Sequence, residues 1–421
     1  MSFDFTQNKH VYLALSSNLG DKLENIKRAI ALLANKKVEI IAVSPICTTP
    51  ALLLKKSPDA WNIPHLNCVI KCNCDLEPIE LLDVIKSVET ELGRDFSKRW
   101  SPRIIDIDIL FYKDKIINSE RLTIPHKEIL NRSFVLDPLS FIYEGKIDNY
   151  YYKTHQPLFE GIINITNNSF SNDGITDFKL FKEKFELFEK NLVPIIDIGA
   201  ESTKPDASPL TQQEELLRLE PIFEYVQNRK FGLIKPLLSI DTYRPETAQL
   251  AIINGFDIVN DVSGLSNPKM LDLAKANKNI KFVFTHNYGL PANKKILEDA
   301  DIIEEIDTWI SEKTEIFNKY GIAKEQMIFD PGIGFGKTTS QSLQILQNLK
   351  NFHKYGFKIL VGHSRKSFLK MFNDKKPEER DFETIAISMG IAENVDIIRV
   401  HTPIQHMSSH LACSHIHNQF V

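Results

Sequence analysis

Eight short apolar runs in the second part of the chain restrict its fold more than any other feature, because each run stops at a polar residue. The runs are GIIN (Asn164), PIIDIG (Asp197), LLSID (Asp241), DIVND (Asn260 and Asp261), KFVFTH (His286), MIFD (Asp330), KILVGHS (Ser364) and DIIRVH (Arg399 and His401). Most of the intervals hold helix-like stretches, such as ETAQLAIING. Eight strand–helix units in roughly 260 residues match the size of a (β/α)8 barrel, the TIM barrel.

The polar residues at the ends of these runs indicate where the chemistry of such a barrel is found. In a (β/α)8 barrel the carboxyl ends of all strands meet at one face, and active sites are built there. Asp and Asn also favour the ends of buried strands for structural reasons, because they form turns. Single residues of this kind carry little weight, but eight together predict one site at a barrel mouth.

The first part of the chain follows a different pattern, with two helices among four strands. The predicted order is strand Val11–Leu15, helix Asp21–Ala34, strand Val38–Ile46, strand Asn67–Cys74, helix Leu76–Leu92 and strand Ile104–Tyr112. A β-α-β-β-α-β order is compatible with a ferredoxin-like sandwich of the α+β class. The aperiodic stretch EGKIDNYYYKTHQP, residues 144–157, is the candidate linker. We therefore expect two domains, residues 1–150 and 151–421.

Composition excludes several classes of function. The chain has 421 residues and a formal net charge of −4, which does not indicate a nucleic-acid surface. The N-terminus lacks the basic and apolar regions of a signal peptide, and no run approaches the roughly 18 apolar residues of a membrane helix. Five cysteines suit reduced thiols. We expect a cytoplasmic protein with small-molecule substrates and no nucleic-acid or membrane partner.

Two groups of cysteine and histidine residues resemble metal sites at first sight. Cys68, Cys72 and Cys74 alternate onto one face of a predicted strand, but neither a fourth ligand nor zinc-type spacing is evident. They are interpreted as small buried core residues. His406 and His410 lie one helical turn apart near the C-terminus, and they are interpreted as the polar face of the last helix.

The segment RWSPRIIDIDIL predicts a site for phosphate chemistry. Asp106 and Asp108 alternate with isoleucines, so both carboxylates face the same side of a strand. Neighbouring carboxylates repel unless a cation lies between them, and Mg²⁺ typically takes one or two carboxylates together with substrate phosphates. A solvated sheet face is the alternative. The basic residues that flank the segment favour phosphoryl-type transfer, and they are Arg94, Lys98, Arg99, Arg103, Arg121, His126 and Arg132.

Four motifs in this region resemble those of 6-hydroxymethyl-7,8-dihydropterin pyrophosphokinases across residues 10–140: VYLALSSNLGD, ETELGRDFSKRW, SPRIIDIDIL and RLTIPHKEILNRSFVLDPL. The resemblance implies that Asp106 and Asp108 hold two Mg²⁺ ions that bridge ATP. The residues that it implies for ATP binding are Glu89, Arg94, Lys98, Arg99, Trp100, Arg103, Ile109, Arg121, Thr123, His126 and Arg132. Those that it implies for the pterin pocket are Thr49, Pro50, Leu52, Asn67 and Phe134, with Phe134 stacked on the ring.

Two departures from the pyrophosphokinase pattern affect these assignments. Ser16 stands where the family usually has glycine. The loop between Arg94 and Trp100 is one residue shorter, which leaves open whether Lys98 or Arg99 closes over the triphosphate.

The glycine-rich stretch DPGIGFGKTT, residues 330–339, looks like a nucleotide loop but does not fit one. A P-loop needs a glycine five residues before its Gly-Lys pair, and Pro331 occupies that position without an N–H to donate. The glycines at 332, 334 and 336 do not have the dinucleotide spacing either. We expect the glycines to permit a tight turn and Lys337 to face solvent or a helix start.

Seven motifs in the second region resemble dihydropteroate synthases over residues 160–403: GIINITNNSFSNDG, DIGAESTKP, SIDTYRPE, IVNDVSG, IFDPGIGFGK, VGHSRKSF and IRVHTP. The resemblance implies a pterin site of Asp241, Asn260, Asp330, Lys366 and Arg399, with Arg399 stacked on the ring. It implies a p-aminobenzoate site of Thr203, Lys204, Pro205, Phe335, Ser364 and Lys366. Asn164, through one Mg²⁺, and His401 would bind the leaving pyrophosphate.

Together the two resemblances imply a bifunctional enzyme of folate biosynthesis. The residues expected to act most directly in catalysis are Asp106, Asp108, Arg94 and Arg103 in the first domain and Lys366, Arg399 and His401 in the second. The loop after Thr166 departs from the synthase pattern, because Asn167 and Asn168 replace a proline and an aspartate. A pterin-dependent methyltransferase barrel and a catalytically decayed domain with a scaffold role remain as alternatives. Analogy also suggests a homodimer through the barrel.

Overall fold

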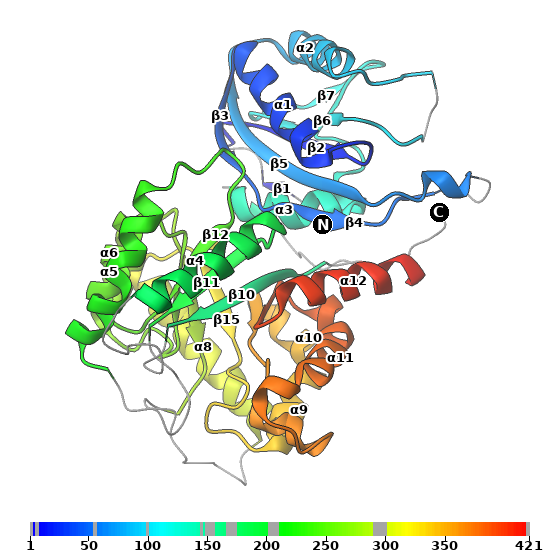
Figure 1. Ribbon diagram of the computed structural model, residues 1–421. Helices are drawn as coiled ribbons and strands as arrows, with labels where there is room; N and C mark the ends of the chain where they lie inside the picture. Colours follow the sequence, from blue (N-terminus) through cyan, green and yellow to red (C-terminus); the bar gives the residue numbers. More distant parts are fainter. Residues whose placement is uncertain are drawn as a thin grey trace. The chain divides into compact units, whose positions relative to one another are not determined.

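The computed structural model of this chain describes residues 3–4, 8–53, 57–97, 101–143, 146–147, 156–165, 175–200, 210–288 and 301–417 (Figure 1). The chain divides into two compact units, one built mainly from residues 1–156 and the other mainly from residues 157–407. The predicted boundary between residues 150 and 151 lies outside the described residues and stays a prediction.

The N-terminal unit is built on an antiparallel sheet. Its elements are β2 (Val11–Ser17), α1 (Lys22–Asn35), β3 (Val38–Val43), β4 (Cys47–Thr49), β5 (His65–Cys74), α2 (Pro78–Glu91) and β6 (Asp106–Tyr112). The main strands lie in the order β3-β5-β2-β6, and β4 adds to β5. This order confirms the ferredoxin-like prediction. The short strand β4, which follows β3 in the chain, is an addition to that fold.

Local sequence signals explain the two helices of this unit. The side chain of Asp21 accepts a hydrogen bond from the backbone of Glu24 and caps α1. Ile26, Ile30 and Leu33 recur along α1 and are buried. Helix α2 begins at Pro78, behind a capping box of Glu77 and Glu80.

The two faces of the sheet have different coverings. Leu13, Cys68 and Ile107 belong to the buried face that packs against α1 and α2. On the opposite face a second core cluster contains Tyr12 and Leu136, the latter from α3 (Ser133–Ile142). Asp106 and Asp108 share this second face and are partly exposed, as their alternation with isoleucines predicted.

The C-terminal unit is a closed barrel of eight parallel strands, in which β10 pairs with both β11 and β17. The strands are β10 (Leu158–Asn164), β11 (Ile195–Gly199), β12 (Leu237–Asp241), β13 (Ile258–Asp261), β14 (Lys281–Thr285), β15 (Met327–Asp330), β16 (Lys358–Val361) and β17 (Ile397–Val400). Each of the eight predicted runs forms one strand. The (β/α)8 prediction is therefore confirmed.

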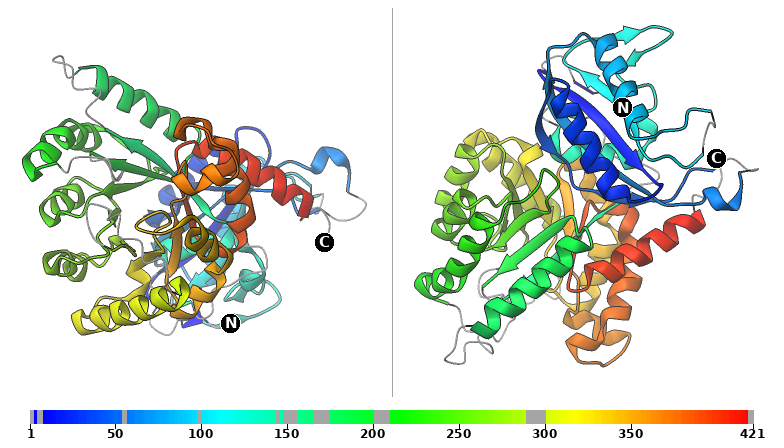
Figure 2. Two further views of the ribbon diagram at one scale, coloured as in Figure 1. Left: turned by 90° about the horizontal axis from the view of Figure 1, so that it is seen from below. Right: turned by 45° about the horizontal axis from the view of Figure 1, so that its top comes forward.

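Helices surround the strands of the barrel (Figures 1 and 2). They are α4 (Ile175–Lys190), α5 (Gln212–Asn228), α6 (Pro245–Ile253), α7 (Pro268–Ala276), α8 (Ile302–Tyr320), α9 (Thr339–Gln347), α10 (Leu349–Phe352), α11 (Asp381–Ile391) and α12 (Pro403–His417). Gly356 ends the segment after α10 in the left-handed conformation, as predicted. Among the described residues, no helix is long and apolar enough to cross a membrane.

The cysteine and histidine interpretations have different outcomes. Cys68, Cys72 and Cys74 are buried free thiols, as predicted. The interpretation of His406 as part of a polar face is wrong, because its side chain is fully buried and its ring lies 5.9 Å from that of Phe159. The first turn of α12 directs this residue inward onto β10, and sequence spacing alone did not show that.

Two candidate active sites

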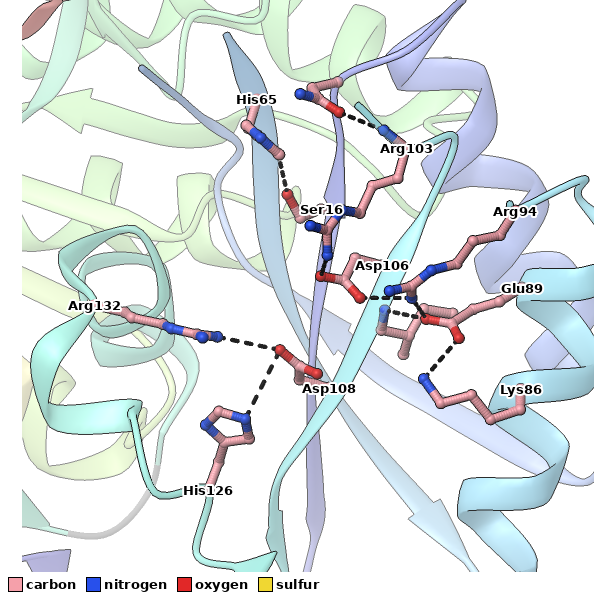
Figure 3. A network of polar contacts seen from close by, with 12 residues as sticks. Ser16, His65, Lys86, Glu89, Arg94, Arg103, Asp106, Asp108, His126 and Arg132 are labelled. Carbon is pink, nitrogen blue, oxygen red and sulfur yellow. Dashed lines mark hydrogen bonds and ion pairs between the residues drawn. The ribbon is translucent and has the colours of Figure 1, made fainter. Parts of the chain in front are cut away.

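Asp106 lies at the centre of a cationic frame on the exposed end of the sheet (Figure 3). Its Oδ1 is 2.6 Å from Nη1 of Arg94, and its Oδ2 is 2.6 Å from Nη1 of Arg103. Burial raises the pKa of Asp106, but the charges of Arg103 and Arg94 outweigh burial and the net pKa is lowered. Asp106 is therefore held as a carboxylate, as a ligand of a cation must be.

Glu89 of α2 holds Arg94 in place. It is fully buried, accepts a hydrogen bond from the backbone N–H of Ile107 at 2.8 Å and forms ion pairs with Arg94 and Lys86. Burial raises the pKa of Glu89 in spite of these cations. Through the ion pair Glu89 positions Arg94. The predicted contact of Glu89 with ATP stays a prediction.

Asp108 lies two residues further along β6 and faces a second pair of bases. Its Oδ2 is 3.3 Å from Nη1 of Arg132 and 3.9 Å from Nε2 of His126. Burial lowers the pKa of His126, and Asp108 opposes that effect only in part. Arg132 is therefore the permanent cation beside Asp108, while His126 serves as a neutral hydrogen-bonding group at neutral pH.

The other predicted nucleotide residues are placed less directly. Arg121 forms an ion pair with Asp83 of α2, and both side chains are more than half exposed. Thr123 lies in the short strand β8 (Thr123–Ile124), and Ile109 is buried in the core. Lys98, Arg99 and Trp100 lie outside the described residues. The role of each in ATP binding stays a prediction.

The predicted pterin pocket of the same unit gathers around the start of β5. The amide of Asn67 donates to Oγ1 of Thr49 at 2.9 Å, and both side chains are buried. Phe134 is partly buried, and the guanidinium carbon of Arg132 lies 5.9 Å from its ring centroid. Pro50 is buried, and Leu52 is 40% exposed. An aromatic ring, an amide and an apolar side chain are what a flat heterocycle requires.

In the barrel, Arg399 connects the middle of β11 to the end of β12. Its Nε donates to Oδ2 of Asp197 at 2.7 Å, and its Nη2 donates to Oδ2 of Asp241 at 2.7 Å. The hydroxyl of Ser239 donates to the remaining oxygen of Asp197 at 2.6 Å. These contacts fix the guanidinium against two carboxylates, and its predicted stacking on the pterin ring stays a prediction.

The same interior holds more carboxyl groups than cations. Burial raises the pKa of Asp241 to about 7; Arg399 opposes this shift and Asp197 adds to it. Glu160 of β10 is fully buried, and neither carboxyl oxygen has a hydrogen-bond partner among the described residues. Burial and Asp197 raise the pKa of Glu160 well above its usual range. Burial therefore raises the pKa of two carboxyl groups in the barrel interior.

Asp330 and Lys366 define the next part of the mouth. Oδ1 of Asp330 accepts the backbone N–H of Gly332 at 2.8 Å, and burial raises its pKa. The ammonium of Lys366 donates to the carbonyl oxygen of Ile333 and lies 4.3 Å from the ring centroid of Phe335. Burial lowers the pKa of Lys366 to about 8. Two predicted pterin residues and one predicted arylamine residue thus lie together.

The expectation that Lys337 faces solvent or a helix start is wrong. Its side chain is only 7% exposed, and its ammonium donates to the carbonyl oxygens of His286, Gly332 and Phe335 at 3.0 to 3.3 Å. The tight turn of the glycine loop directs two of its own carbonyls toward that of His286, and these three carbonyls need a buried donor. Thr338, not Lys337, caps the following helix α9.

The last predicted residues lie around the ends of β10, β13 and β17. Oγ of Ser364 is 2.9 Å from Nδ1 of His401, and burial lowers the pKa of His401 to about 3, so its ring is neutral. Asn164 is exposed at the end of β10, while Asn260 is buried at the end of β13. Thr203, Lys204 and Pro205 and the altered loop 167–173 lie outside the described residues.

Comparison with known proteins connects both halves of the chain to one pathway. A model for pterin binding enzymes matches residues 160–401, and a model for 7,8-dihydro-6-hydroxymethylpterin-pyrophosphokinase matches residues 12–144. A folate synthesis bifunctional protein of Chlamydia caviae is 33% identical, over 94% of this chain and 96% of its own length. The chain belongs to the folate synthesis bifunctional proteins.

Two further relatives agree with this membership. A folate synthesis bifunctional protein of Arabidopsis thaliana is 32% identical over 95% of this chain and 94% of its own length. The crystal structure of dihydropteroate synthase from Anaplasma phagocytophilum, with bound 6-hydroxymethylpterin-monophosphate, is 32% identical. It covers 62% of this chain and 99% of that chain with a TM-score of 0.57. This member of the family is therefore a bifunctional transferase with a pyrophosphokinase domain and a dihydropteroate synthase barrel.

Sequence reasoning did not assign four residues that this folate synthesis bifunctional protein places at its two sites. Asp197 ends one of the eight predicted strands, so its position was visible but its ion pair with Arg399 was not. Glu160 interrupts an apolar strand with a charge, and that interruption was the available signal. Ser16 and His65 adjoin Asp106 only through the pairing of β2 with β5 and β6, which a linear pattern does not show.

Proposed function

We propose that the N-terminal unit transfers pyrophosphate from ATP to 6-hydroxymethyl-7,8-dihydropterin at the sheet face that carries Asp106 and Asp108. The barrel then condenses the product with p-aminobenzoate, at the mouth formed by Asp241, Asp330 and Arg399. The observation that carries the first step is the pair of carboxylates on one sheet face, framed by Arg94, Arg103 and Arg132. That arrangement suits a triphosphate that arrives with divalent cations.

The carboxylate pair fits Mg²⁺ by its donor chemistry. Asp106 and Asp108 are partly exposed, and two carboxylates leave the other coordination positions to phosphate and water. Within the part of the chain that the structure describes, no cluster of three or more potential ligands forms a closed metal cage. Asp106 and Asp108 would hold two Mg²⁺ ions, which supply charge neutralisation on the phosphates. Asn164 would hold one more in the barrel.

In the first reaction the hydroxymethyl oxygen of the pterin attacks the β-phosphorus of ATP. An oxygen–phosphorus bond forms, the bond to the α-phosphate oxygen breaks, and AMP leaves. Arg94 and Arg103 already point at the position of Asp106 and would contact the phosphate oxygens, while Arg132 and His126 would do so beside Asp108. Lys98 or Arg99 would close over the triphosphate.

In the second reaction the amine of p-aminobenzoate attacks the methylene carbon of the pterin, and pyrophosphate leaves. Asp241, Asn260 and Asp330 would bind the donor–acceptor edge of the ring, because Asp241 is paired with Asn260 across β12 and β13 and Asp330 ends β15 of the same barrel. Lys366 would donate to the ring carbonyl, and Phe335 would cover the arylamine. Neutral His401 would donate one hydrogen bond to pyrophosphate, beside Asn164.

One assay tests both steps at once. The intact chain is given ATP, Mg²⁺, hydroxymethyl-dihydropterin and labelled p-aminobenzoate, and AMP and dihydropteroate are measured together. The proposal predicts both products. AMP without dihydropteroate would mean a decayed or repurposed barrel, and methyl transfer to a corrinoid would favour the methyltransferase alternative. Absence of AMP would contradict the kinase assignment.

The proposal extends to assembly and location. A homodimer through the barrel is expected by analogy with related barrels. Light scattering of the purified chain measures its mass against the 48.2 kDa of one copy, and a monomer at all concentrations would contradict the dimer. Cytoplasmic location stays a prediction, because the names of some plant relatives place them in mitochondria.

A further inference from the structure

Ser16 lies between the predicted pterin pocket and the predicted magnesium ligand. In the register of the sheet, Ser16 of β2 is directly opposite Asn67 of β5 on one side and Asp106 of β6 on the other. Side chains that are directly opposite in an antiparallel pair lie on the same face, with Cβ atoms about 5 Å apart. The three side chains therefore form one row across the sheet, Asn67–Ser16–Asp106.

His65 belongs to the same face and is bonded to Ser16. It precedes Asn67 by two residues on β5, so both side chains point to the same side. Nδ1 of His65 is 2.8 Å from Oγ of Ser16, and both residues are half-buried (Figure 3). Ser17, the next residue on β2, is fully buried on the other face. The Ser16–His65 pair is thus a polar group on an accessible face.

The position of His65 is fixed from both sides. The amide of Asn18 donates to the carbonyl oxygen of Ile63 at 3.2 Å, and its Oδ1 accepts the backbone N–H of Arg103 at 2.8 Å. The ammonium of Lys22 donates to the carbonyl oxygen of Pro64 at 2.7 Å. The segment before His65 is therefore tied both to α1 and to the segment that carries Arg103.

The charge state of His65 determines how the pair is bonded. The pKa of His65 is lowered to about 4, chiefly by burial and then by Arg103 and Lys22, while Asp106 opposes the shift. A neutral ring has one nitrogen that accepts, and in the tautomer that we infer here this nitrogen is Nδ1, so that Ser16 is the donor. The oxygen of Ser16 then keeps its lone pairs for a hydroxyl that approaches along the row.

We propose that Ser16 and His65 form the subsite for the hydroxymethyl group of the pterin. This inference rests on the proposed pyrophosphokinase function, in which that group connects a ring near Asn67 to a phosphorus near Asp106. The substrate hydroxyl donates its hydrogen to Oγ of Ser16, which leaves an oxygen lone pair directed at the β-phosphorus. His65 is a positioning residue, because it holds the hydroxyl of Ser16 in the accepting orientation.

A subsite of this kind gives selectivity for the hydroxyl group. A site that hydrogen-bonds a substrate hydroxyl rejects the analogue that lacks it, because its own polar groups are then left unpaired. The protein should therefore bind hydroxymethyl-dihydropterin about tenfold or more tightly than 6-methyl-7,8-dihydropterin. Without Ser16 most of that difference should disappear.

The test measures the binding of both compounds through the rate of AMP formation. This rate depends on the N-terminal site and not on the barrel. The KM for hydroxymethyl-dihydropterin and the inhibition constant of 6-methyl-7,8-dihydropterin are measured for the wild type, S16A, S16T, H65F and H65Q. We expect S16A and H65F to raise KM about tenfold and to leave the inhibition constant within twofold. S16T and H65Q keep a hydroxyl and a hydrogen-bond acceptor and should recover most of the wild-type KM.

The matched control is H10Q, at the other end of the same sheet. Nδ1 of His10 is 2.9 Å from Oδ1 of Asn73, so this variant also removes a histidine–side-chain contact from the sheet. It should change neither constant. Condensation of p-aminobenzoate with supplied pterin pyrophosphate verifies that each variant is folded.

The results separate this inference from the proposed function. An S16A variant with unchanged KM overturns the subsite, and so does an equal rise in both constants, which would indicate a general distortion of the pocket. A wild-type chain that forms no AMP overturns the proposed kinase function and the subsite with it. Loss of discrimination with AMP formation intact supports both.

Discussion

The ammonium group of Lys337 donates a hydrogen bond of 3.1 Å to the carbonyl oxygen of His286, which directly follows the neighbouring strand β14. The same group donates to two carbonyls of its own loop, those of Gly332 and Phe335. It also lies 5.5 Å from the ring centroid of Tyr288. One buried lysine therefore ties the glycine loop after β15 to the adjacent strand and sets the position of Phe335.

We expect Lys337→Met to destabilise the barrel by about 3 kcal/mol, because it leaves three inward carbonyls without their shared donor. The loop should also lose its fixed shape, so the KM for p-aminobenzoate should rise while AMP formation is unchanged. Urea denaturation and the two product assays measure these effects. Lys350→Met, at an exposed lysine of α10, is the control. Equal stability of the two variants would contradict the role of Lys337.

A pair of glycine substitutions tests the same loop through its backbone. Gly332 and Gly334 both have positive φ, 69° and 78°, so alanine is strained to a similar extent at each. At Gly332, however, an added Cβ would lie 2.0 Å from the carbonyl oxygen of His286, whereas at Gly334 it would lie 3.1 Å from the flexible side chain of Lys366.

Gly332→Ala should therefore lower the free energy of unfolding by about 2 kcal/mol more than Gly334→Ala, since backbone cannot move aside as a side chain can. Chemical denaturation of the two variants gives the difference. If both variants lose the same stability, the close approach between the loop and the backbone of His286 does not exist in solution.

The sequence predicted most of the fold and the outline of both sites. Strand ends are readable because an apolar run that stops at a polar residue, such as Asp241 or Asp330, marks both the strand and its exit into the mouth. The placement of Asp106 and Asp108 on one face of a strand followed from the two-residue period of side chains in a strand. These features are local, so neighbouring residues were sufficient to find them.

The features that were missed depend on contacts between distant segments. Lys337 looked like a surface residue, because nothing in its neighbourhood shows that three carbonyls turn toward it. His406 looked polar, and its burial depends on packing against Phe159. The Ser16–His65 contact joins residues 49 positions apart. Each requires the pairing of elements, which periodicity does not specify.

Two carboxyl groups of the barrel interior make a contribution to the pH dependence of stability that can be isolated by substitution. The pKa of Asp241 is raised to about 7 in the folded protein, chiefly by burial. Between pH 4 and 7 this carboxyl group therefore binds more protons in the folded than in the unfolded state, so its own contribution to the free energy of unfolding falls as pH rises through this window. Glu160 contributes in the same direction, because burial also raises its pKa. Histidines whose pKa is lowered by burial, such as His401, contribute in the opposite direction.

Asp241→Asn and Glu160→Gln should each remove a falling contribution, so the slope of the free energy of unfolding against pH between 4.5 and 7.5 should be more positive than in the wild type. Urea denaturation at half-unit intervals measures this slope. Asp272→Asn, at an exposed position of α7, is the control and should keep the wild-type slope. Variants whose slopes equal that of the wild type would contradict the raised pKa of both groups.

The separation of the two activities provides the last prediction, and Asp108 is the better of the two carboxylates for it. Removal of Asp106 would leave both Arg94 and Arg103 without their shared partner, so lost activity could reflect a disturbed fold. Asp108 is more exposed, and its contacts at 3.3 and 3.9 Å are longer.

Asp108→Ala should therefore fold normally, lower the rate of AMP formation by about a thousandfold and leave condensation of supplied pterin pyrophosphate unchanged. Lys366→Met should give the reverse result, with AMP but little dihydropteroate. Asp83→Ala, which removes only the surface partner of Arg121, should retain both reactions. Loss of both activities in a folded Asp108→Ala protein would show that the two sites do not work independently.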